Sequence, residues 1–486
     1  MINRRNFLTL SALSATALAV NGCSKKIEKP KIDEQRTKLI ERTKQDKVRV
    51  VIVGGGFGGL NTASAIKQND ANDEIEVVVI EKNPYYFACP MSNTLLSGHP
   101  DFKKEKFIFN YRKVQLTHGF EVLHAEVNNI DRNEQKVFTN KEAIAYDYLV
   151  LAPGIEYDYK VEFPQWSDAK IARAKLEAPG GLISDVGVEH SILLEQLEEF
   201  KERGGEGEIV IIPQRTKIFS SLEKSHPHKS VIRCAPASYE RACMIGDWIK
   251  RNNLVGKTKV VILDSSMSPQ AKPAAFNQVF EDLYEGIVEY IGGFELMDVD
   301  FDTKEILYRD IDDDLNYIVA RRKYDVLNLI PIQKASSVIE MAGIKTNSWG
   351  GALLDPRKLT SLSDSNIYAV GDSAVLVNNK NISIPPAAQS AYSLGKEVGA
   401  IIASRVIKNK QIELSSLLVG CSSMVSIQPL KLGINITKEF GFDKKNEMWI
   451  REILELNEDK KYYDESGGEG LLGWFDAITG DTFASY

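Results

Sequence analysis

One stretch constrains the fold of this chain more than any other: VRVVIVGGGFGGLNTASAI, residues 48–66. An apolar strand from Val48 to Val53 runs into Gly54, Gly56 and Gly59, and helical spacing follows. Glycines at these positions give a tight turn, close backbone approach to a pyrophosphate, and close packing of helix on strand. The unpaired N–H groups at the start of the helix then face the phosphates. The stretch therefore predicts a dinucleotide-binding unit at the start of a parallel α/β sheet.

Three further segments indicate which dinucleotide is bound. The apolar strand IEVVVIE ends at Glu81, 22 residues after Gly59, where an acid can bind ribose hydroxyls. Residues 146–158, YDYLVLAPGIEYD, resemble the crossover that closes the FAD half of flavoproteins with two dinucleotide domains. Residues 366–374, NIYAVGDSA, resemble the segment that holds the flavin ribityl chain, here through Gly371 and Asp372. Each segment alone could be an ordinary buried strand and turn, but together and in this order they favour FAD.

A second unit of the same kind begins at residues 207–219, GEIVIIPQRTKIF, but it lacks the glycine turn. Pro213 and Gln214 follow its strand instead. Side chains at this point would block the close approach of a pyrophosphate. We therefore do not expect NADH or NADPH to reduce this protein.

The N-terminus has the layout of a bacterial export signal. Residues 3–23, NRRNFLTLSALSATALAVNGC, contain an arginine pair and a 13-residue apolar run, Leu8–Val20. A membrane span takes roughly 20 residues, so this run is too short to be one. The arginine pair resembles a twin-arginine signal, and VNGC resembles a lipoprotein cleavage box that would leave Cys23 lipidated. An ordinary signal peptide with an incidental cysteine is the alternative. We expect an exported protein, periplasmic or lipid-anchored on the outer side of the cytoplasmic membrane.

Composition excludes several other classes of protein. A length of 486 residues suggests two or three domains, and 43% hydrophobic with 26% charged residues is typical of a soluble globular protein. The net charge of −7 without a long basic run makes nucleic acid an unexpected partner. Five cysteines are too few for a disulfide scaffold. No metal site is expected, because His226 and His228 have no visible further ligand.

Besides Cys23 the chain has four cysteines, of which Cys89 stands in PYYFACPMSN. A thiol there could fill a core, pair in a disulfide, act as a nucleophile or carry a group covalently. The segments YYFACPMSN (85–93), RCAPASYERA (233–242), LNLIPIQKA (327–335) and VGCSSM (419–424), with NIYAVGDSA, give the chain a specific resemblance. It resembles the flavoprotein subunit of flavocytochrome c sulfide dehydrogenase, a family that is related to sulfide:quinone oxidoreductases and has the glutathione-reductase-like fold. The resemblance runs from about residue 48 to the C-terminus.

The resemblance implies roles for three cysteines. In that family the cysteine that Cys89 matches carries FAD through a thioether. The cysteines that Cys234 and Cys421 match form a redox-active disulfide beside the flavin. Hydrosulfide attacks such a disulfide and leaves a persulfide and a thiolate. The alternatives are a buried structural thiol for Cys89 and a static disulfide in an exported protein for the pair.

The resemblance also implies roles for Glu240 and for one helix. Glu240 matches a carboxylate that the family places near the flavin, where it could move protons; a solvated glutamate or an ion pair with Arg241 is the alternative. Residues 382–402 resemble the helix whose N-terminus faces the flavin, where its dipole would stabilise reduced flavin. Cys243 lies nine residues after Cys234 on an expected helix, which separates the two by about 13 Å. We expect Cys243 to be a core thiol.

These observations predict an α/β fold with two Rossmann-like dinucleotide-binding domains, glutathione-reductase-like, and a C-terminal interface region. The expected divisions are an export signal (1–23), a charged tether (24–47), an FAD domain in two parts (48–160 and 326–390), a second dinucleotide-type domain (161–325) and the interface region (391–486).

The expected function is that of a sulfide dehydrogenase, an FAD enzyme acting on a small inorganic sulfur substrate. Its electrons would pass to a c-type cytochrome subunit or a soluble cytochrome c; the chain has no CxxCH, so the haem would be on another polypeptide. Contact with a membrane is expected only through a lipid at Cys23. The alternatives are a sulfide:quinone oxidoreductase, which needs an apolar groove toward the membrane, and a lipid-anchored electron-transfer flavoprotein without sulfide turnover.

Overall fold

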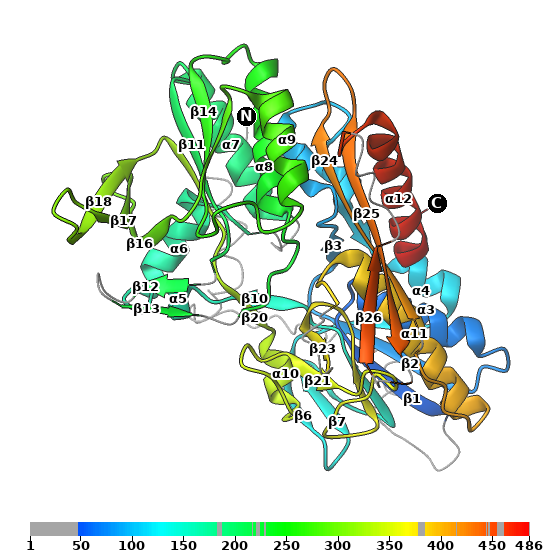
Figure 1. Ribbon diagram of the computed structural model, residues 1–486. Coiled ribbons are helices and arrows are strands. Elements are labelled where there is room, and N and C mark those ends of the chain that lie inside the picture. Colours follow the sequence, from blue (N-terminus) through cyan, green and yellow to red (C-terminus); the bar gives the residue numbers. More distant parts are fainter. Residues whose placement is uncertain are drawn as a thin grey trace, which may run out of the picture. The chain divides into compact units, whose positions relative to one another are not determined.

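The glycine-turn unit begins a five-stranded parallel sheet in the computed structural model (Figure 1). Strand β1 (Val48–Val53) lies between β2 (Ile75–Glu81) and β9 (Tyr148–Leu151). Strand β22 (Ile367–Ala369) pairs with β9, and β5 (Glu121–His124) pairs with β2. Strands that are buried on both faces read as continuous apolar runs, as β9 and most of β1 and β2 do. The strands expected around the FAD motifs are thus confirmed.

The structure describes residues 47–181, 187–215, 217–219, 224–227, 230–377, 384–414, 416–443, 445, 448–453 and 461–485. The expected export signal, with its arginine pair and Cys23, lies outside the described residues. The tether does too, apart from its last residue, Lys47.

Two helices from distant parts of the sequence pack on each other beside this sheet. They are α3 (Phe57–Asn69) and α11 (Ala388–Ile407). A Cβ added at Gly395 would lie 2.4 Å from the carbonyl oxygen of Gly58, and one added at Gly399 would lie 2.6 Å from that of Thr62. Only glycine allows so close an approach of two helix backbones. Helix α11 therefore belongs with the first domain, and the boundary expected at residue 391 is wrong because it falls inside this helix.

Short elements complete the first domain. The helical ones are η2 (Ser92–Ser97), η3 (Lys104–Phe107), α4 (Arg112–His118), α10 (Ser337–Met341) and η5 (Gly371–Ser373). The strand pairs and the small sheet are β3 (Tyr85–Phe87) with β4 (Ile108–Asn110), β6 (Val127–Asp131) with β7 (Lys136–Thr139) and β8 (Ala143–Ala145), β10 (Ile155–Tyr157) with β20 (Gln333–Ala335), and β21 (Ala352–Leu354) with β23 (Ala374–Leu376).

The second domain contains a four-stranded parallel sheet of order β15-β14-β11-β19 (Figure 1). Its strands are β11 (Gly207–Ile212), β14 (Thr258–Leu263), β15 (Val288–Ile291) and β19 (Val326–Leu329). The second dinucleotide-type sheet is thus present, as expected. The boundary expected at residue 326 is wrong, however, because β19 pairs with β11 and so belongs to this sheet. The chain returns to the first domain only after β19, at β20.

Helices and an antiparallel sheet surround the second sheet. The helices are α5 (Tyr159–Glu162), α6 (Asp168–Glu177), α7 (Val188–Glu202), α8 (Ala237–Arg251) and α9 (Pro273–Tyr284). The antiparallel sheet contains β16 (Glu295–Asp300), β17 (Glu305–Ile311) and β18 (Tyr317–Lys323), and β12 (Lys217–Phe219) pairs with β13 (Ser225–Pro227).

The C-terminal region contacts both domains. Strands β24 (Ser416–Ser426), β25 (Leu432–Asp443) and β26 (Met448–Ile453) form an antiparallel sheet, and α12 (Glu465–Phe483) packs on β25. Strand β24 contacts α8 of the second domain and α11 of the first. This strand carries the VGCSSM segment, which is how that segment comes between the two domains.

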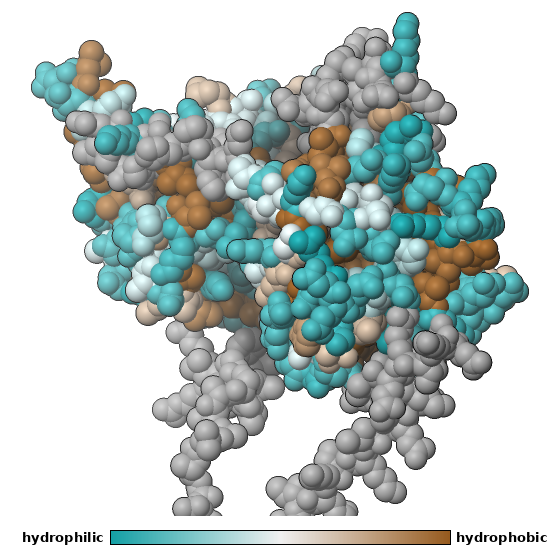
Figure 2. All heavy atoms as spheres, turned by 90° about the horizontal axis from the view of Figure 1, so that it is seen from below, coloured by the Kyte–Doolittle hydropathy of each residue, from teal (hydrophilic) through white to brown (hydrophobic). Residues whose placement is uncertain are grey.

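Polar side chains predominate on the face shown in Figure 2, and apolar ones gather there in separate patches. Some exposed apolar residues, such as Leu315 and Tyr317, belong to the β17–β18 hairpin. In the part of the chain that the structure describes, none of the helices is both long and apolar enough to span a bilayer.

Candidate functional site

The glycine turn leaves no room for side chains beside the start of α3. Gly54 has φ +111°, and a Cβ added there would lie 2.1 Å from the carbonyl oxygen of Ala152. A Cβ added at Gly59 would lie 1.9 Å from the carbonyl oxygen of Gly54. Gly56 is the N-cap of α3 and offers no side chain to its first N–H groups. A pyrophosphate binds to free N–H groups at a helix N-terminus, where a turn without side chains lets it approach the backbone. This turn therefore fits the phosphates of FAD.

Glu81 ends β2 beside this turn. One carboxylate oxygen accepts the N–H of Gly55 at 2.8 Å and the other accepts the N–H of Asn83 at 2.9 Å. The hydroxyl of Tyr111 is buried nearby and has no hydrogen-bond partner among the described residues. Burial, helped by the charge of Glu81, raises the pKa of Tyr111, so this hydroxyl stays protonated. A fixed carboxylate beside the turn fits the ribose hydroxyls of a dinucleotide.

The GDS segment meets the same turn from the other side. A Cβ added at Gly58 would lie 2.9 Å from a methyl group of Val370, which lies between β22 and Gly371. Gly371 has φ +79°, and Asp372 follows it within η5. The carboxylate of Asp372 accepts a hydrogen bond from Nε of Arg233 at 2.6 Å, across from the second domain. The residues expected to hold the ribityl chain therefore lie next to those expected to hold the phosphates.

Arg233 also joins Asp372 to the first cysteine. Its Nη1 donates to Sγ of Cys89 at 3.2 Å, and Arg233 and Cys89 are only 6% and 7% exposed. The thiols of Cys89 and Cys234 contact each other. The hydrogen bond from Cys234 and the charge of Arg233 lower the pKa of Cys89, whereas that bond and burial raise the pKa of Cys234. Cys89 is thus the better nucleophile of the two, because the thiolate is the reactive form.

Cys234 has an unusual backbone. Its φ is +53°, in the left-handed region, which costs a residue with a side chain about 1 kcal/mol or more. Its N–H donates to the carbonyl oxygen of Pro386 at 3.2 Å, and its own carbonyl accepts the N–H of Ala237 at 2.9 Å. These bonds hold the thiol between the start of α8 and the segment that precedes α11. That segment is the one expected to face the flavin.

Cys421, the partner expected for Cys234, lies in β24 opposite Ile436. Its side chain lies outside the described part of the structure, and Cys234 is a free thiol in the structure. The Cys234–Cys421 disulfide therefore stays a prediction. Cys243 is 0% exposed within α8, where burial raises its pKa. This burial agrees with the expected core thiol.

The two most specific segments interlock through Asn93. Its amide nitrogen donates to the carbonyl of Ala237 at 3.1 Å and to a carboxylate oxygen of Glu240 at 3.2 Å. Its amide oxygen accepts Nε of Arg241 at 3.1 Å, and Arg241 also donates to Asn328 at 2.9 Å. All these side chains are buried, so each hydrogen bond is needed to offset the loss of water. CPMSN, RCAPASYERA and LNLIPIQKA thus belong to one network.

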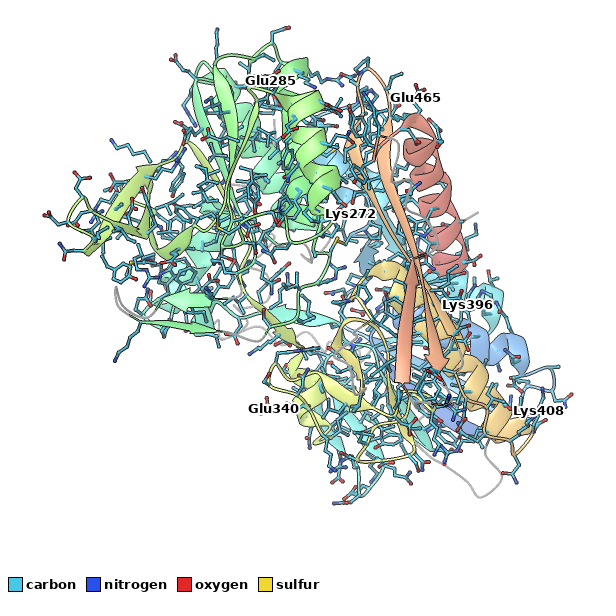
Figure 3. The ribbon with its side chains drawn as sticks, viewed as in Figure 1. Lys272, Glu285, Glu340, Lys396, Lys408 and Glu465 are labelled. Atoms are coloured by element: carbon cyan, nitrogen blue, oxygen red, sulfur yellow. The ribbon has the colours of Figure 1, made fainter. Side chains whose placement is uncertain are left out.

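Glu240 is buried in this network at 9% exposure, so it is not a solvated glutamate. Its hydrogen-bond partners are Asn93 and Ser423, and Arg241 bonds to other groups. Lys272 donates to the hydroxyl of Ser423 at 2.9 Å. Figure 3 labels Lys272 at the start of α9, near the strands of the C-terminal sheet. The ion pair between Glu240 and Arg241, one of the alternatives, does not form.

Four residues of this site are not found by sequence reasoning: Asn93, Arg233, Lys272 and Ser423. Asn93, Arg233 and Ser423 carry a usable signal, because all three stand inside the segments that carry the resemblance. Lys272 carries none, since it lies outside these segments and only the folded chain brings it to Ser423.

The place of a second pyrophosphate is filled by side chains. Pro213, Gln214 and Arg215 follow β11 and are all buried. Gln214 donates to the carbonyl of Val231 at 2.6 Å, and Arg215 forms a buried ion pair with Glu162. A pyrophosphate could approach this backbone only if these side chains left.

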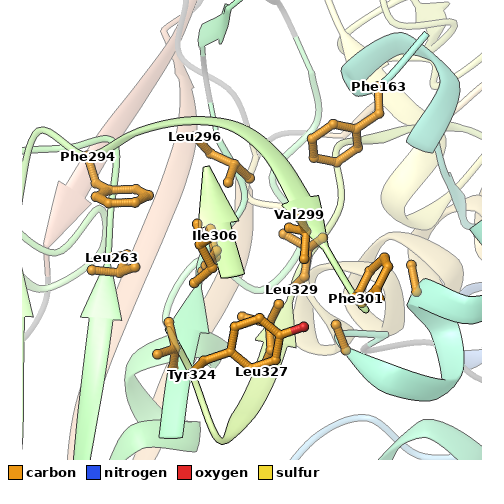
Figure 4. Packing of buried hydrophobic residues seen from close by; sticks show 14 of the residues in the cluster. Phe163, Leu263, Phe294, Leu296, Val299, Phe301, Ile306, Tyr324, Leu327 and Leu329 are labelled. Carbon is orange, nitrogen blue, oxygen red and sulfur yellow. The ribbon is translucent and has the colours of Figure 1, made fainter. Parts of the chain in front are cut away.

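The acidic residue that follows β14 is also hydrogen-bonded to side chains of its own domain. Asp264 comes directly after β14, where a ribose-binding acid would stand. It accepts the hydroxyl of Tyr239 at 2.7 Å and the amide of Gln270 at 3.0 Å. Beyond these residues the domain is a closed apolar core, with Leu263 and Leu329 from the sheet and Phe163 and Phe301 against them (Figure 4). The second unit thus keeps the fold of a dinucleotide domain, with bonded side chains where the pyrophosphate and the ribose would bind.

A small pocket lies beside Cys234, with a volume of about 10 Å³, room for about one water molecule. It is lined by Pro213, Gln214, Ile232, Arg233, Cys234, Ala235, Ser238, Tyr239, Gln270, Ile330 and Gln333. The pocket therefore brings Cys234 next to the residues that follow β11 and β19.

Two parallel sheets, a glycine turn and a cysteine site between them define a flavoprotein with the glutathione-reductase-like fold. Comparison with known families makes the class specific. Residues 48–176 match the pyridine nucleotide-disulphide oxidoreductase family, and residues 225–331 match the central domain of the sulfide dehydrogenase [flavocytochrome c] flavoprotein chain. The resemblance seen in the motifs is confirmed: the two matched segments are similar to a pyridine nucleotide-disulphide oxidoreductase and to this central domain, which are FAD-binding flavoprotein families.

Individual relatives show similarity of different extents. The mitochondrial sulfide:quinone oxidoreductase of Dictyostelium discoideum is 21% identical over 490 residues, which covers 96% of each chain. The type II NADH:quinone oxidoreductase of Staphylococcus haemolyticus is 32% identical over 112 residues, only 27% of that protein's length and 23% of this chain. The crystal structure of the sulfide:quinone oxidoreductase of Aquifex aeolicus superposes with a TM-score of 0.63 at 15% identity, covering 90% of this chain and 92% of that one.

Proposed function

We propose that this protein oxidises sulfide at Cys234, with FAD as the first electron acceptor, and passes the electrons to a c-type cytochrome. The observation that carries the proposal is the setting of Cys234. It belongs to the region that matches the sulfide dehydrogenase central domain, contacts Cys89 and lines a small pocket. The resemblance in the motifs supports a cytochrome as the acceptor, and the expected export signal supports a location outside the cytoplasmic membrane.

The residues that would hold FAD follow from the fit described above. Gly54, Gly56 and Gly59 would hold the pyrophosphate, Glu81 the ribose, and Gly371 with Asp372 the ribityl chain. Cys89 would carry the flavin through a thioether, and its lowered pKa supports this because attachment requires a thiolate. Bound FAD supplies a two-electron acceptor next to the cysteines.

The residues of the chain would carry out the sulfur chemistry in one exchange. Hydrosulfide attacks a Cys234–Cys421 disulfide, a new S–S bond forms to one cysteine, and the other leaves as a thiolate that holds the electron pair. The positive charge of Arg233 would stabilise anionic sulfur at Cys234. The carboxylate of Glu240, in the same buried network, would accept the proton that the persulfide loses.

A second candidate is sulfide oxidation with a quinone as acceptor. It is favoured by the Dictyostelium sulfide:quinone oxidoreductase, whose similarity extends along nearly the whole chain. The two candidates share the sulfide half-reaction and differ in the acceptor, so the same purified protein can distinguish them.

The test is an anaerobic titration of the FAD-loaded protein with sulfide, followed through the flavin absorbance. Sulfide should bleach the unmodified protein, whereas Cys234→Ser and Cys421→Ser should abolish bleaching and retain FAD. Cys243→Ser is the matched control, because this core thiol is expected to be inert. Added cytochrome c should then restore the oxidised spectrum faster than a soluble quinone does. Normal reduction of both serine variants would refute the sulfide assignment, and reoxidation by quinone alone would favour the second candidate.

A further inference from the structure

A hydrogen-bonded path leads from the buried network to the surface of the second domain. Glu240, in α8, is hydrogen-bonded to Ser423 of β24, and the hydroxyl of Ser423 accepts Nζ of Lys272 at 2.9 Å. Ser423 is fully buried, whereas Lys272 is half-buried. Lys272 is the N-cap of α9, has φ +52° and is followed by Pro273. The left-handed conformation and the following proline restrict the backbone of Lys272, so its side chain starts from one fixed position.

The charges around Glu240 determine whether its carboxyl group is ionised. The ionisable groups near it are Lys272 before α9, Cys89 after β3, Cys234 before α8, and Arg241 and Cys243 on its own helix, where Arg241 shares Asn93 with it. Of these Lys272 and Arg241 are cations, and the charge of Lys272 favours the ionised form of Glu240. Burial is the largest effect on Glu240 and raises its pKa, and the bond to Ser423 and the charge of Lys272 lower it.

We propose that Lys272 and Ser423 are positioning residues that keep Glu240 ionised beside Cys234, so that Glu240 can accept the proton released during sulfide oxidation. This inference rests on the proposed function. Hydrosulfide and the disulfide give a persulfide and a thiolate, and conversion of one hydrosulfide to the zero-valent state releases two electrons and one proton. Bound FAD would supply the acceptor for the electrons, and the proton needs an acceptor within the buried site. A carboxyl group that is already protonated cannot accept it.

The effect of removing Lys272 can be given a sign and a size. An opposite charge nearby lowers the pKa of a carboxyl by about 1–3 units. Lys272→Met should therefore move the protonation midpoint of Glu240 to higher pH by about one unit. If flavin reduction by sulfide requires ionised Glu240, the acid limb of its pH–rate profile should move in the same direction. Ser423→Ala should move the protonation midpoint and the acid limb in the same direction by a smaller amount. Lys272→Arg should keep both at their values in the unmodified protein.

The test measures both quantities on the full-length, FAD-loaded protein. Glu240 is titrated through the infrared absorption of its protonated carboxyl group, which is assigned as the band missing from Glu240→Gln. The matched control is Lys257→Met, which removes an exposed lysine from the turn between α8 and β14. The ionisation of sulfide is the same for every variant, so only differences between the profiles are interpreted.

The outcomes separate this inference from the proposed function. A midpoint that moves in Lys272→Met and Ser423→Ala but not in Lys257→Met supports the role of the two residues. An unchanged midpoint in both variants overturns it, even if sulfide reduces the flavin normally, and Ser423→Ala alone decides if Lys272→Met does not fold. If the midpoint moves and the pH–rate profile does not, Glu240 is not the proton acceptor and the inference fails. If sulfide reduces no variant at any pH, the proposed function fails and the inference about proton transfer fails with it.

Discussion

Replacing Arg215 tests whether bonded side chains of the second domain stably fill the place where a second pyrophosphate would bind. The ion pair with Glu162 is almost completely desolvated, with side chains that are 3% and 5% exposed. Removing one partner of such a pair leaves an unpaired buried charge, which costs about 3–5 kcal/mol, whereas an exposed pair contributes about 1 kcal/mol or less. Arg215→Gln should therefore lower the free energy of unfolding by about 3 kcal/mol at neutral pH. The Glu162→Gln/Arg215→Gln double variant should cost less than the sum of the two single variants, because neither charge is then unpaired.

The pH dependence of the stability loss is a second, independent test of the buried ion pair. Burial already raises the pKa of Glu162, and loss of Arg215 should raise it further. A carboxyl with a raised pKa in the folded state destabilises the protein above its ordinary pKa, and the penalty disappears as pH falls toward that value. The deficit of Arg215→Gln should thus shrink between pH 7 and pH 5. The deficit of Glu162→Gln should not, because arginine keeps its charge over this range.

The measurement is equilibrium unfolding in urea, followed by tryptophan fluorescence. Trp166 is a local probe, because it is fully buried and stacks on Phe163, the residue after Glu162, with 4.0 Å between ring centroids. Arg173→Gln is the matched control, since Arg173 pairs with Glu177 and Asp302 on the exposed side of the neighbouring helix α6. If Arg215→Gln is no less stable than this control, or if its deficit does not change with pH, the reasoning is refuted.

Two further predictions concern the flavin. If Cys89 carries FAD covalently, flavin absorbance should stay with the chain after acid precipitation, and Cys89→Ser should release it; free FAD in the supernatant of the unmodified protein would rule the thioether out. Because Pro213, Gln214 and Arg215 fill the second pyrophosphate place, neither NADH nor NADPH should bleach the flavin within minutes in an anaerobic cuvette. Rapid stoichiometric reduction by either nucleotide would show that this place can open.

Much of the fold could be predicted from local patterns. The strand, glycine turn, helix, strand and acid of residues 48–81 follow one another along the chain, and their spacing alone defines the unit. The second unit and its missing glycine turn are equally local, since Pro213 and Gln214 directly follow their strand. Such predictions succeed because parallel strands buried on both faces are apolar throughout, and because a turn that must approach a phosphate tolerates only glycine.

The domain boundaries could not be predicted in this way. Residues 326–329 read as an apolar strand that either sheet could accept, and only its pairing with β11 assigns it to the second. Helix α11 belongs to the first domain because Gly395 and Gly399 let it approach α3, a contact that no spacing rule contains.

The site shows the same division between sequence and tertiary structure. Sequence resemblance identified Cys89, Cys234 and Glu240, since each lies in a short segment whose order of residues is specific. It did not predict that the thiols of Cys89 and Cys234 touch, that Arg233 bridges Cys89 and Asp372, or that Lys272 reaches Glu240 through Ser423. In each directly bonded pair, the two residues are more than 100 positions from each other in the sequence. Only Glu240 and Lys272, which interact through Ser423, are closer in the sequence. Hydrogen bonds and charges act over a few ångströms, so they depend on which segments the two domains and β24 bring together, and only the tertiary structure decides that.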